Sequence, residues 1–174
     1  MIKRSVLIVL LSVSLAACGF NLRGSQQFGS ELVGQLYLEE QGNISVLQPL
    51  RKALTAQQVR FAAVRGDADT IVVLGNEVIS RRVASVSSSG RVSEYELLHA
   101  VDLQTIRAVD GVRAGQLEIT SDNQPKEKTV SVARDYTYDE TDVLAKDDEE
   151  RILRDEMADE LVRHLVLVIF SGLR

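Results

Sequence analysis

The sequence predicts an α+β fold, a two-layer sandwich in which a mostly antiparallel or mixed sheet of about four strands carries two helices on one face. Three observations predict it. Two segments repeat apolar residues at helical spacing, and several long segments between them alternate apolar and polar residues, as strands with one buried face do. Each predicted helix also has a single apolar stripe, so placing both helices on the apolar face of the sheet buries all of this surface.

The composition is that of a globular domain. The chain has 174 residues, of which 45% are hydrophobic and 26% charged, and this excludes a wholly disordered chain. A single Cys excludes a disulfide framework. Two His and a net charge of -5 argue against a His-rich metal site and against a nucleic-acid groove.

The first 34 residues predict export and a lipid anchor. Lys3 and Arg4 precede an uncharged run over residues 5–17, which is typical of a secretory signal peptide and too short to span a membrane. The run ends in Leu15-Ala16-Ala17-Cys18, which resembles the bacterial lipobox. We therefore expect a cleaved lipoprotein signal peptide over 1–17, a lipidated tether over 18–34 and a single α/β domain over 35–174.

The lipobox resemblance implies a diacylglycerol and an N-acyl chain on Cys18, and no other cofactor is expected. Gly19 follows the Cys, where lipoproteins retained in the inner membrane commonly carry Asp, so the resemblance points to the periplasmic face of the outer membrane. The alternative is a free or buried thiol after an ordinary cleavage site. A spare thiol in an oxidising compartment would be a liability, which favours lipidation.

The first part of the domain predicts two strands around a helix. Residues 35–39 favour a short strand, and another is expected over 59–64. Between them, three leucines at i, i+3 and i+7 share one helix face: Leu47, Leu50 and Leu54. Pro49 must then lie in the first helical turn, where its missing N–H matters least.

A long hairpin follows. Residues 70–86 favour a strand, residues 87–90 a turn, and from Arg91 a second strand alternates clearly. The apolar face of this second strand comprises Tyr95, Leu97, His99, Val101 and Leu103. We expect His99 to be a core histidine rather than a catalytic one.

Two more strands and a helix complete the prediction. Asp110-Gly111 is a hairpin signal, and strands are expected over 112–120 and 130–138. Asp147 and Glu150 form a capping box that predicts a helix from Asp147 to about Leu167. Its apolar stripe comprises Leu153, Met157, Leu161 and Leu165, widened by Ile152 and Val162.

The residues that could carry chemistry do not form a catalytic set. The acidic run 147–150 is consecutive, whereas an EF-hand needs alternate ligands and a Gly. The turn at 87–90 lacks the spacing and the Lys of a phosphate-binding loop. We therefore expect neither an enzyme nor a metal site. Basic residues that could bind an anion are spread along the chain: Arg81, Arg82, Arg91, Arg134 and Lys146.

Several segments together resemble the LptE family of lipopolysaccharide-assembly lipoproteins. They are Cys18-Gly19-Phe20-Asn21-Leu22-Arg23-Gly24, Glu94-Tyr95-Glu96-Leu97, Arg134-Asp135-Tyr136 with Tyr138-Asp139, and Val143-Leu144-Ala145-Lys146-Asp147-Asp148-Glu149-Glu150 followed by Glu156-Met157. The resemblance implies an outer-membrane lipoprotein that plugs the LptD β-barrel in a one-to-one complex, assists its assembly and binds lipopolysaccharide during insertion into the outer leaflet. It implies no nucleic-acid partner. The alternative is a free-standing periplasmic lipid carrier, or an adaptor lipoprotein of another envelope transport system.

The resemblance also implies candidate lipopolysaccharide-binding residues. Lys146 matches the family's basic residue in the Ala-Lys segment. The family's basic turn residue falls at Ser88, and Arg91, three residues further on, could take its place. Arg134, on the last predicted strand, completes the candidate set.

Overall fold

The computed structural model describes residues 33–109, 111–118, 125, 127–139 and 143–172. Its strands are β1 (Gln35–Gln41), β2 (Arg60–Phe61), β3 (Thr70–Val86), β4 (Val92–Arg107) and β5 (Lys128–Thr137). Its helices are α3 (Leu47–Ala56) and α4 (Val143–Ser171), with short 3-10 turns η1 (Arg65–Asp67) and η2 (Ala114–Gln116). The predicted signal peptide, Cys18 and most of the predicted tether lie outside the described residues.

The sheet is mixed and its strand order is β2-β1-β3-β4-β5. β1 runs parallel to both of its neighbours, whereas β3, β4 and β5 are antiparallel. The α+β prediction is confirmed, with five strands rather than about four. One of the five is β2, a two-residue strand within the predicted range 59–64, which pairs with β1 at Gln35 and Leu36.

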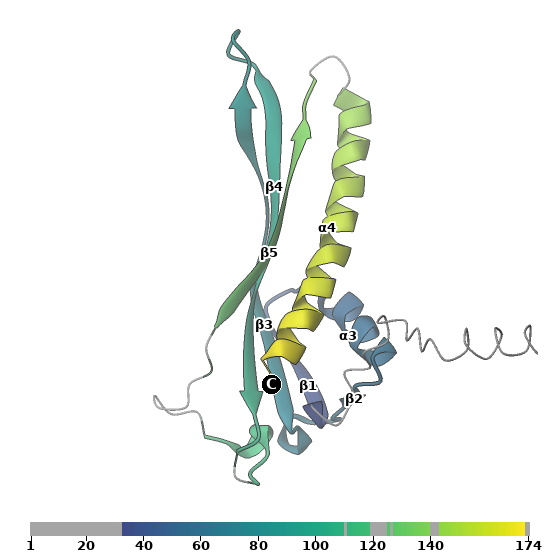
Figure 1. Cartoon of the computed structure of the whole chain (residues 1–174), viewed down its shortest axis with the longest axis vertical. Coiled ribbons are helices and arrows are strands. Elements are labelled where there is room, and N and C mark those ends of the chain that lie inside the picture. The colour runs from purple at the N-terminus through teal and green to yellow at the C-terminus, as the bar shows by residue number, and fades with distance from the viewer. Residues whose placement is uncertain (1–32, 110, 119–124, 126, 140–142, 173–174) are drawn as a thin grey trace, which may run out of the picture.

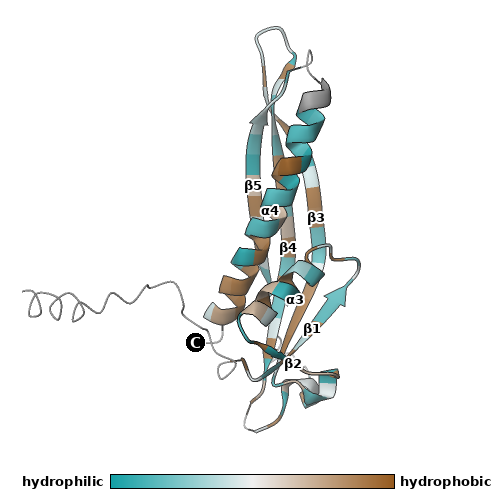
Figure 2. Ribbon diagram, turned by 90° about the vertical axis from the view of Figure 1, so that its right-hand side faces the viewer, coloured by the Kyte–Doolittle hydropathy of each residue, from teal (hydrophilic) through white to brown (hydrophobic). Residues whose placement is uncertain are grey.

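Both helices cover the same face of the sheet, as predicted (Figure 1). The main core lies between them and the sheet, and its fully enclosed members include Leu36, Leu50, Leu54, Leu97, Met157, Leu161, Leu165, Ile169 and Phe170. The apolar part of α4 is concentrated in its C-terminal half, beside α3 (Figure 2). Pro49 lies in the first turn of α3, as its missing N–H requires.

A smaller core lies on the other face, under η1 and η2. It comprises Ala62, Ala68, Ile71, Val73, Ile106 and Ala114. The strand predicted over 112–120 is wrong for its described part: Val112 forms a single bridge with Val109, and η2 follows. Gly115 explains the difference, because a Cβ there would lie 1.9 Å from the Arg65 carbonyl oxygen, so the segment is held against η1 as a loop.

Helix α4 is longer than predicted at both ends. It begins at Val143 instead of Asp147, so Asp147 lies within the helix and is not its N-cap. The preceding Leu, Ala and Lys are strong helix formers, which extend the helix toward the N-terminus. At the other end it continues to Ser171, because Ile169 and Phe170 are buried in the core. Ile152 is 51% exposed and does not widen the stripe, whereas Val162 is buried as predicted.

The hairpin of β3 and β4 extends well beyond β1. Pairing of β1 with β3 ends where Gln41 lies opposite Gly75. A register shift follows between Gly75 and Val78, and Asn76 there has φ +49. Past this point the sheet consists of β3, β4 and β5 under the first half of α4, and we call this part the distal half (Figure 1).

Candidate functional site at the distal end

The hairpin turn and the start of α4 lie at the same end of the molecule (Figures 1 and 2). In the turn, the Ser87 N–H donates to the Arg91 carbonyl oxygen at 2.7 Å, and the Gly90 N–H donates to the Ser87 carbonyl oxygen at 2.9 Å. Gly90 has φ +79, a conformation that favours glycine. Ser88 and Arg91 are both exposed. The turn therefore places the Ser88 hydroxyl and the Arg91 side chain on the surface at the distal end.

Lys146 lies in the first turn of α4. Its Nζ contacts Glu149 Oε2 at 2.7 Å, and its side chain is half-buried. The N–H groups of a first helical turn have no partners within the helix, and the helix dipole there favours an anion. The structure thus brings three of the four candidate residues, Ser88, Arg91 and Lys146, to one end of the molecule.

Arg134 is placed apart from the other three. It lies on β5 opposite Leu97 and pairs with Glu160 of α4. Glu160 follows Lys146 by 14 residues, which is about 21 Å along a helix. Arg134 therefore stabilises the contact between β5 and α4 well away from the distal end.

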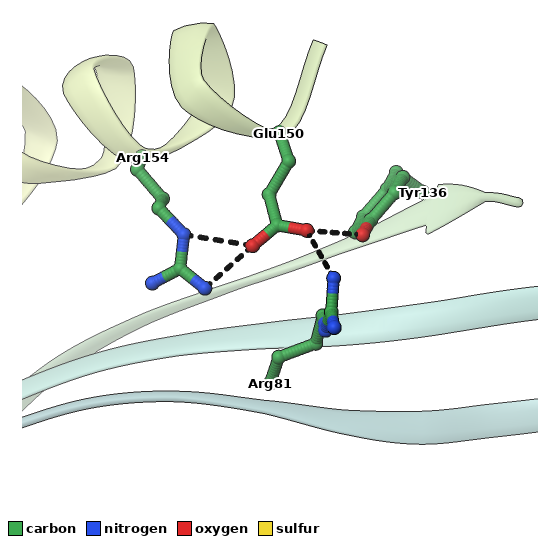
Figure 3. Close-up of polar contacts among 4 residues, drawn as sticks. All are labelled: Arg81, Tyr136, Glu150 and Arg154. Carbon is green, nitrogen blue, oxygen red and sulfur yellow. Dashed lines mark hydrogen bonds and ion pairs between the residues drawn. The ribbon is translucent and has the colours of Figure 1, made fainter. Parts of the chain in front are cut away.

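Beneath the distal end, two arginines and a tyrosine converge on one carboxylate (Figure 3). Glu150 of α4 accepts hydrogen bonds from Arg81 Nη1 at 2.7 Å, from the Tyr136 hydroxyl at 2.5 Å and from Arg154 Nη2 at 2.6 Å. The Glu150 side chain is only 12% exposed. Because the partners come from β3, β5 and α4, this Glu150 cluster joins the helix to the sheet.

The surroundings shift the ionisation of the cluster. Burial would raise the pKa of Glu150, but the hydrogen bonds from Tyr136, Arg154 and Arg81 outweigh it and lower the pKa to about 2. Burial, together with the bond to Glu150, raises the pKa of Tyr136 to about 12. The hydrogen bond to Glu150 also raises the pKa of Arg81. At neutral pH the carboxylate is charged and the phenol is neutral, so the network is fully formed.

Tyrosine rings extend the cluster along the sheet. Tyr95 and Tyr136 stack with centroids 5.8 Å apart, and Tyr138 meets Tyr95 edge-on at 5.1 Å. The Arg81 guanidinium lies 4.6 Å from the Tyr95 ring centroid. Such contacts order planar side chains beyond what apolar burial achieves.

Sequence reasoning missed the Glu150 cluster. Glu150 was expected to cap the helix, whereas it bonds across to the sheet. Two signals were present: Glu150 and Arg154 have the i, i+4 spacing of neighbours on one helix face, and Tyr95 lies on the helix-facing side of its strand. The sequence does not reveal the strand register, and it is this register that brings Arg81 and Tyr136 to Glu150.

His99 is a core residue, as predicted. Its Nε2 lies 2.8 Å from Glu77 Oε1, and both side chains are buried. Glu77 also accepts hydrogen bonds from the Ser45 N–H and hydroxyl, both at 2.6 Å. Burial raises the pKa of Glu77, but the bonds from Ser45 and His99 lower it on balance. Glu77 thus ties the start of α3 to the hairpin.

In the described part of the chain, no three His, Cys, Asp or Glu side chains come together in a group that could hold a metal ion. Within the same residues, no helix is both long enough and apolar enough to cross a membrane.

The fold is that of small bacterial lipoproteins. The crystal structure of rare lipoprotein B from Shewanella oneidensis matches with a TM-score of 0.64 at 21% identity, covering 79% of this chain and 95% of that one. The solution structure of lipoprotein B from Nitrosomonas europaea matches with a TM-score of 0.63 at 20% identity, covering 84% and 87%. At these identities the likeness concerns the fold.

The sequence comparisons define the family. The family model described as LptE, lipopolysaccharide-assembly, matches residues 25–169. The LPS-assembly lipoproteins LptE of Yersinia pestis (strain Pestoides F) and Yersinia pseudotuberculosis serotype O:1b (strain IP 31758) are each 30% identical over 176 residues, covering 95% of this chain and 78% of the relative. The chain therefore belongs to the LptE family of lipopolysaccharide-assembly lipoproteins, which are not enzymes.

Proposed function

We propose that this lipoprotein is held at the periplasmic face of the outer membrane by acyl chains on Cys18. There it binds and plugs an LptD-type β-barrel in a one-to-one complex and assists the assembly of that barrel. It also contacts lipopolysaccharide during insertion into the outer leaflet. The observation that carries the proposal is the family match over residues 25–169.

The shape and polarity of the distal half support the plug. The hairpin and the first half of α4 form a narrow projection (Figure 1). The sheet face turned away from α4 is polar here, because Arg82 forms a bidentate pair with Glu96 at 2.6 and 2.9 Å, and Asp135 lies beside Glu96. The lumen of a membrane barrel is lined by polar side chains, so a polar plug surface complements it.

The distal end supports contact with the glycolipid. Lipid A phosphates are anions that Lys and Arg bind well. Lys146 is half-buried but its partner Glu149 is exposed, and an ion pair of this kind on a helix surface contributes little, so Lys146 can exchange that partner for a phosphate at small cost. Ser88 and Arg91 add a hydroxyl and a second cation on the turn.

Arg134 is a separate candidate. Its pairing with Glu160, far along α4, places it outside the distal group. If the glycolipid contact extends along β5, a change at Arg134 weakens lipopolysaccharide binding independently of Lys146. One open cavity in the described part of the chain, between β4 and α4, has about 170 Å³, which is small beside the roughly 300–1,000 Å³ of ordinary ligand pockets and does not favour the carrier alternative.

Affinity purification from detergent-solubilised outer membranes tests the proposal. The full lipoprotein carries a tag at Arg174, and mass spectrometry identifies and quantifies its partners. We expect one barrel protein at equal stoichiometry. Recovery of the lipoprotein alone, or with inner-membrane transporter components, would contradict the plug and favour the carrier. Mass analysis of the same material tests for three acyl chains on an N-terminal Cys18.

A further inference from the structure

The two candidate cations at the distal end belong to different layers of the sandwich. Lys146 lies in the first turn of α4, and Arg91 follows the turn that joins β3 to β4. A ligand that contacts both side chains therefore bridges the helix and the sheet. Its affinity depends on how firmly the start of α4 is held against the hairpin.

Apolar packing becomes sparse toward the start of α4. Among the side chains of α4 that the structure describes, Met157 is the first buried one, and those from Lys146 to Glu156 are partly buried or exposed. On the sheet, the residues of β3 from Val78 to Val86 are also partly buried or exposed. Figure 2 shows that α4 is mainly hydrophilic toward the distal end. Polar contacts therefore carry much of the attachment of this part of the helix.

The Glu150 cluster provides that attachment. Glu150 of α4 accepts hydrogen bonds from Arg81 of β3 and from Tyr136 of β5, and these two strands lie on either side of β4. Hydrogen bonds to an ionised carboxylate are short, strong and directional. Two such bonds from different strands fix the helix both along the sheet and across it.

The cluster lies close to both cations. Lys146 precedes Glu150 by four residues, which is about 6 Å along the helix. On the sheet, Tyr136 pairs with Tyr95, and Arg91 precedes Tyr95 by four residues, or about 14 Å of extended chain. A shift of α4 at Glu150 would therefore change the position of Lys146 relative to Arg91.

We propose that Glu150 is a positioning residue of the glycolipid contact, which locks α4 to the hairpin so that Lys146 and Arg91 bind the phosphates of one ligand together. Glu150 acts through these two cations and does not touch the ligand. A group that is already held in place loses less freedom on binding, so it contributes more to affinity. This role rests on the proposed lipopolysaccharide contact and deepens it.

Charge alone predicts the opposite effect of removing Glu150. A carboxylate close to the site repels phosphates, so Glu150→Gln would strengthen binding if only the net charge mattered. If Glu150 positions the cations, the same substitution weakens binding, because a neutral amide holds Arg81 and Tyr136 less strongly. The direction of the change in affinity therefore distinguishes the two effects.

Binding of the full mature lipoprotein to lipopolysaccharide micelles tests the positioning role. We expect Glu150→Gln to lower the affinity about fivefold although both cations remain. Lys146→Ala should lower it about tenfold when Glu150 is present, but less than about threefold in the Glu150→Gln background, and Arg91→Ala should behave in the same way. A loss of folded protein would scale all affinities equally, so it would leave the effect of Lys146→Ala unchanged. Melting curves show that each variant is folded at the temperature of the assay.

Two further variants serve as controls. Asp148→Asn removes a carboxylate two residues from Glu150 whose partner, Arg151, lies on the same helix at 3.5 Å, so the affinity should stay the same or increase. Tyr136→Phe removes one hydrogen bond to Glu150 without a change of charge, and should lower the affinity about threefold. It also tests the positioning role if Glu150→Gln does not fold.

Unchanged or stronger binding with Glu150→Gln and Tyr136→Phe would overturn the positioning role. An effect of Lys146→Ala that is equally large with and without Glu150 would overturn it as well. If neither Lys146→Ala nor Arg91→Ala weakens binding in the otherwise unmodified protein, the glycolipid contact at the distal end is itself wrong, and the positioning role falls with it. The single cation variants therefore test the contact, and the Glu150→Gln background tests the positioning.

Discussion

Arg81 on β3 and Glu150 on α4 form an ion pair of 2.7 Å although 69 positions separate them in the chain. The pair spans the two layers of the sandwich. Lys146 lies one helical turn before Glu150. Arg81 lies on β3, the strand that leads into the hairpin turn. The ion pair therefore fixes the helix start and the hairpin turn relative to each other.

Removing the shared carboxylate should destabilise the domain. Glu150→Ala leaves Tyr136 and two guanidiniums without their acceptor, and we expect the free energy of unfolding to fall by about 2 kcal/mol. Urea denaturation of the full mature lipoprotein measures the change. The control is Glu149→Ala, which removes an exposed carboxylate with one partner, Lys146 on the same helix, and should cost less than about 0.5 kcal/mol. Equal losses in the two variants would contradict the role of the cluster.

The same carboxylate should make stability depend on acid. Because the pKa of Glu150 is lowered from 4.5 to about 2, its contribution is complete above pH 4.5 and is lost as the pH falls toward 2. Glu150→Gln should therefore show a flatter decline of unfolding free energy in this window than the unmodified protein does. Parallel declines would show that Glu150 does not carry the effect.

Reversing the charge at Lys146 should weaken lipopolysaccharide binding. We expect Lys146→Glu to lower the affinity for lipopolysaccharide micelles about tenfold, because a phosphate contact becomes a repulsion. Barrel recovery and thermal stability should not change. Lys52→Glu, on the exposed side of α3 at the other end of the molecule, is the matched control. Binding that is unaffected by Lys146→Glu would remove this residue from the site.

The turn offers a paired test of which residue supplies the second cation. Arg91→Glu should weaken lipopolysaccharide binding, and Ser88→Lys should strengthen it, because each changes the charge of an exposed turn position without removing a core contact. Binding at several salt concentrations measures both effects, which should shrink as salt increases. If neither variant changes binding, the turn does not contact the glycolipid.

A charge in the stripe of α4 should unfold the domain. Leu161 is fully buried, and Leu161→Asp should cost more than about 4 kcal/mol because an unpaired carboxylate replaces core contacts. Leu167→Asp, on the exposed side of the same helix, should cost less than about 1 kcal/mol. Circular dichroism melting of the two full-length variants distinguishes a packing effect from an effect of helix propensity.

The repeated patterns predicted most of the fold. The leucines of α3, the alternation on β4 and the stripe from Met157 to Leu165 each give the correct element and the correct buried face. Where prediction was wrong, a long-range contact decided the structure. Gly115 lies shortly after a hairpin signal, where the sequence pattern predicts a strand. It lies in a loop instead because η1 packs closely against it.

The site was less predictable for the same reason. The positions of Lys146 and Arg91 at one end follow from hairpin length and helix direction, both of which the sequence indicates. The separation of Arg134 from them depends on where β5 lies along α4, and that register is set by the side chains in the core. No local spacing in the sequence predicts that Arg81 and Tyr136 both donate hydrogen bonds to Glu150 on a helix far away in the chain.

The last turn of α4 has a consequence for the order of folding. Ile169 and Phe170 belong to the same core as Leu36, Leu50 and Leu54. The end of α4 therefore packs in one core with β1 and α3, the first elements of the domain. During synthesis, β1 and α3 emerge long before the residues that cover them. The contacts that close this core have a large separation in sequence and form late. A chain stopped after Leu167 would expose those leucines, and we expect it to aggregate or be degraded instead of forming a shorter domain.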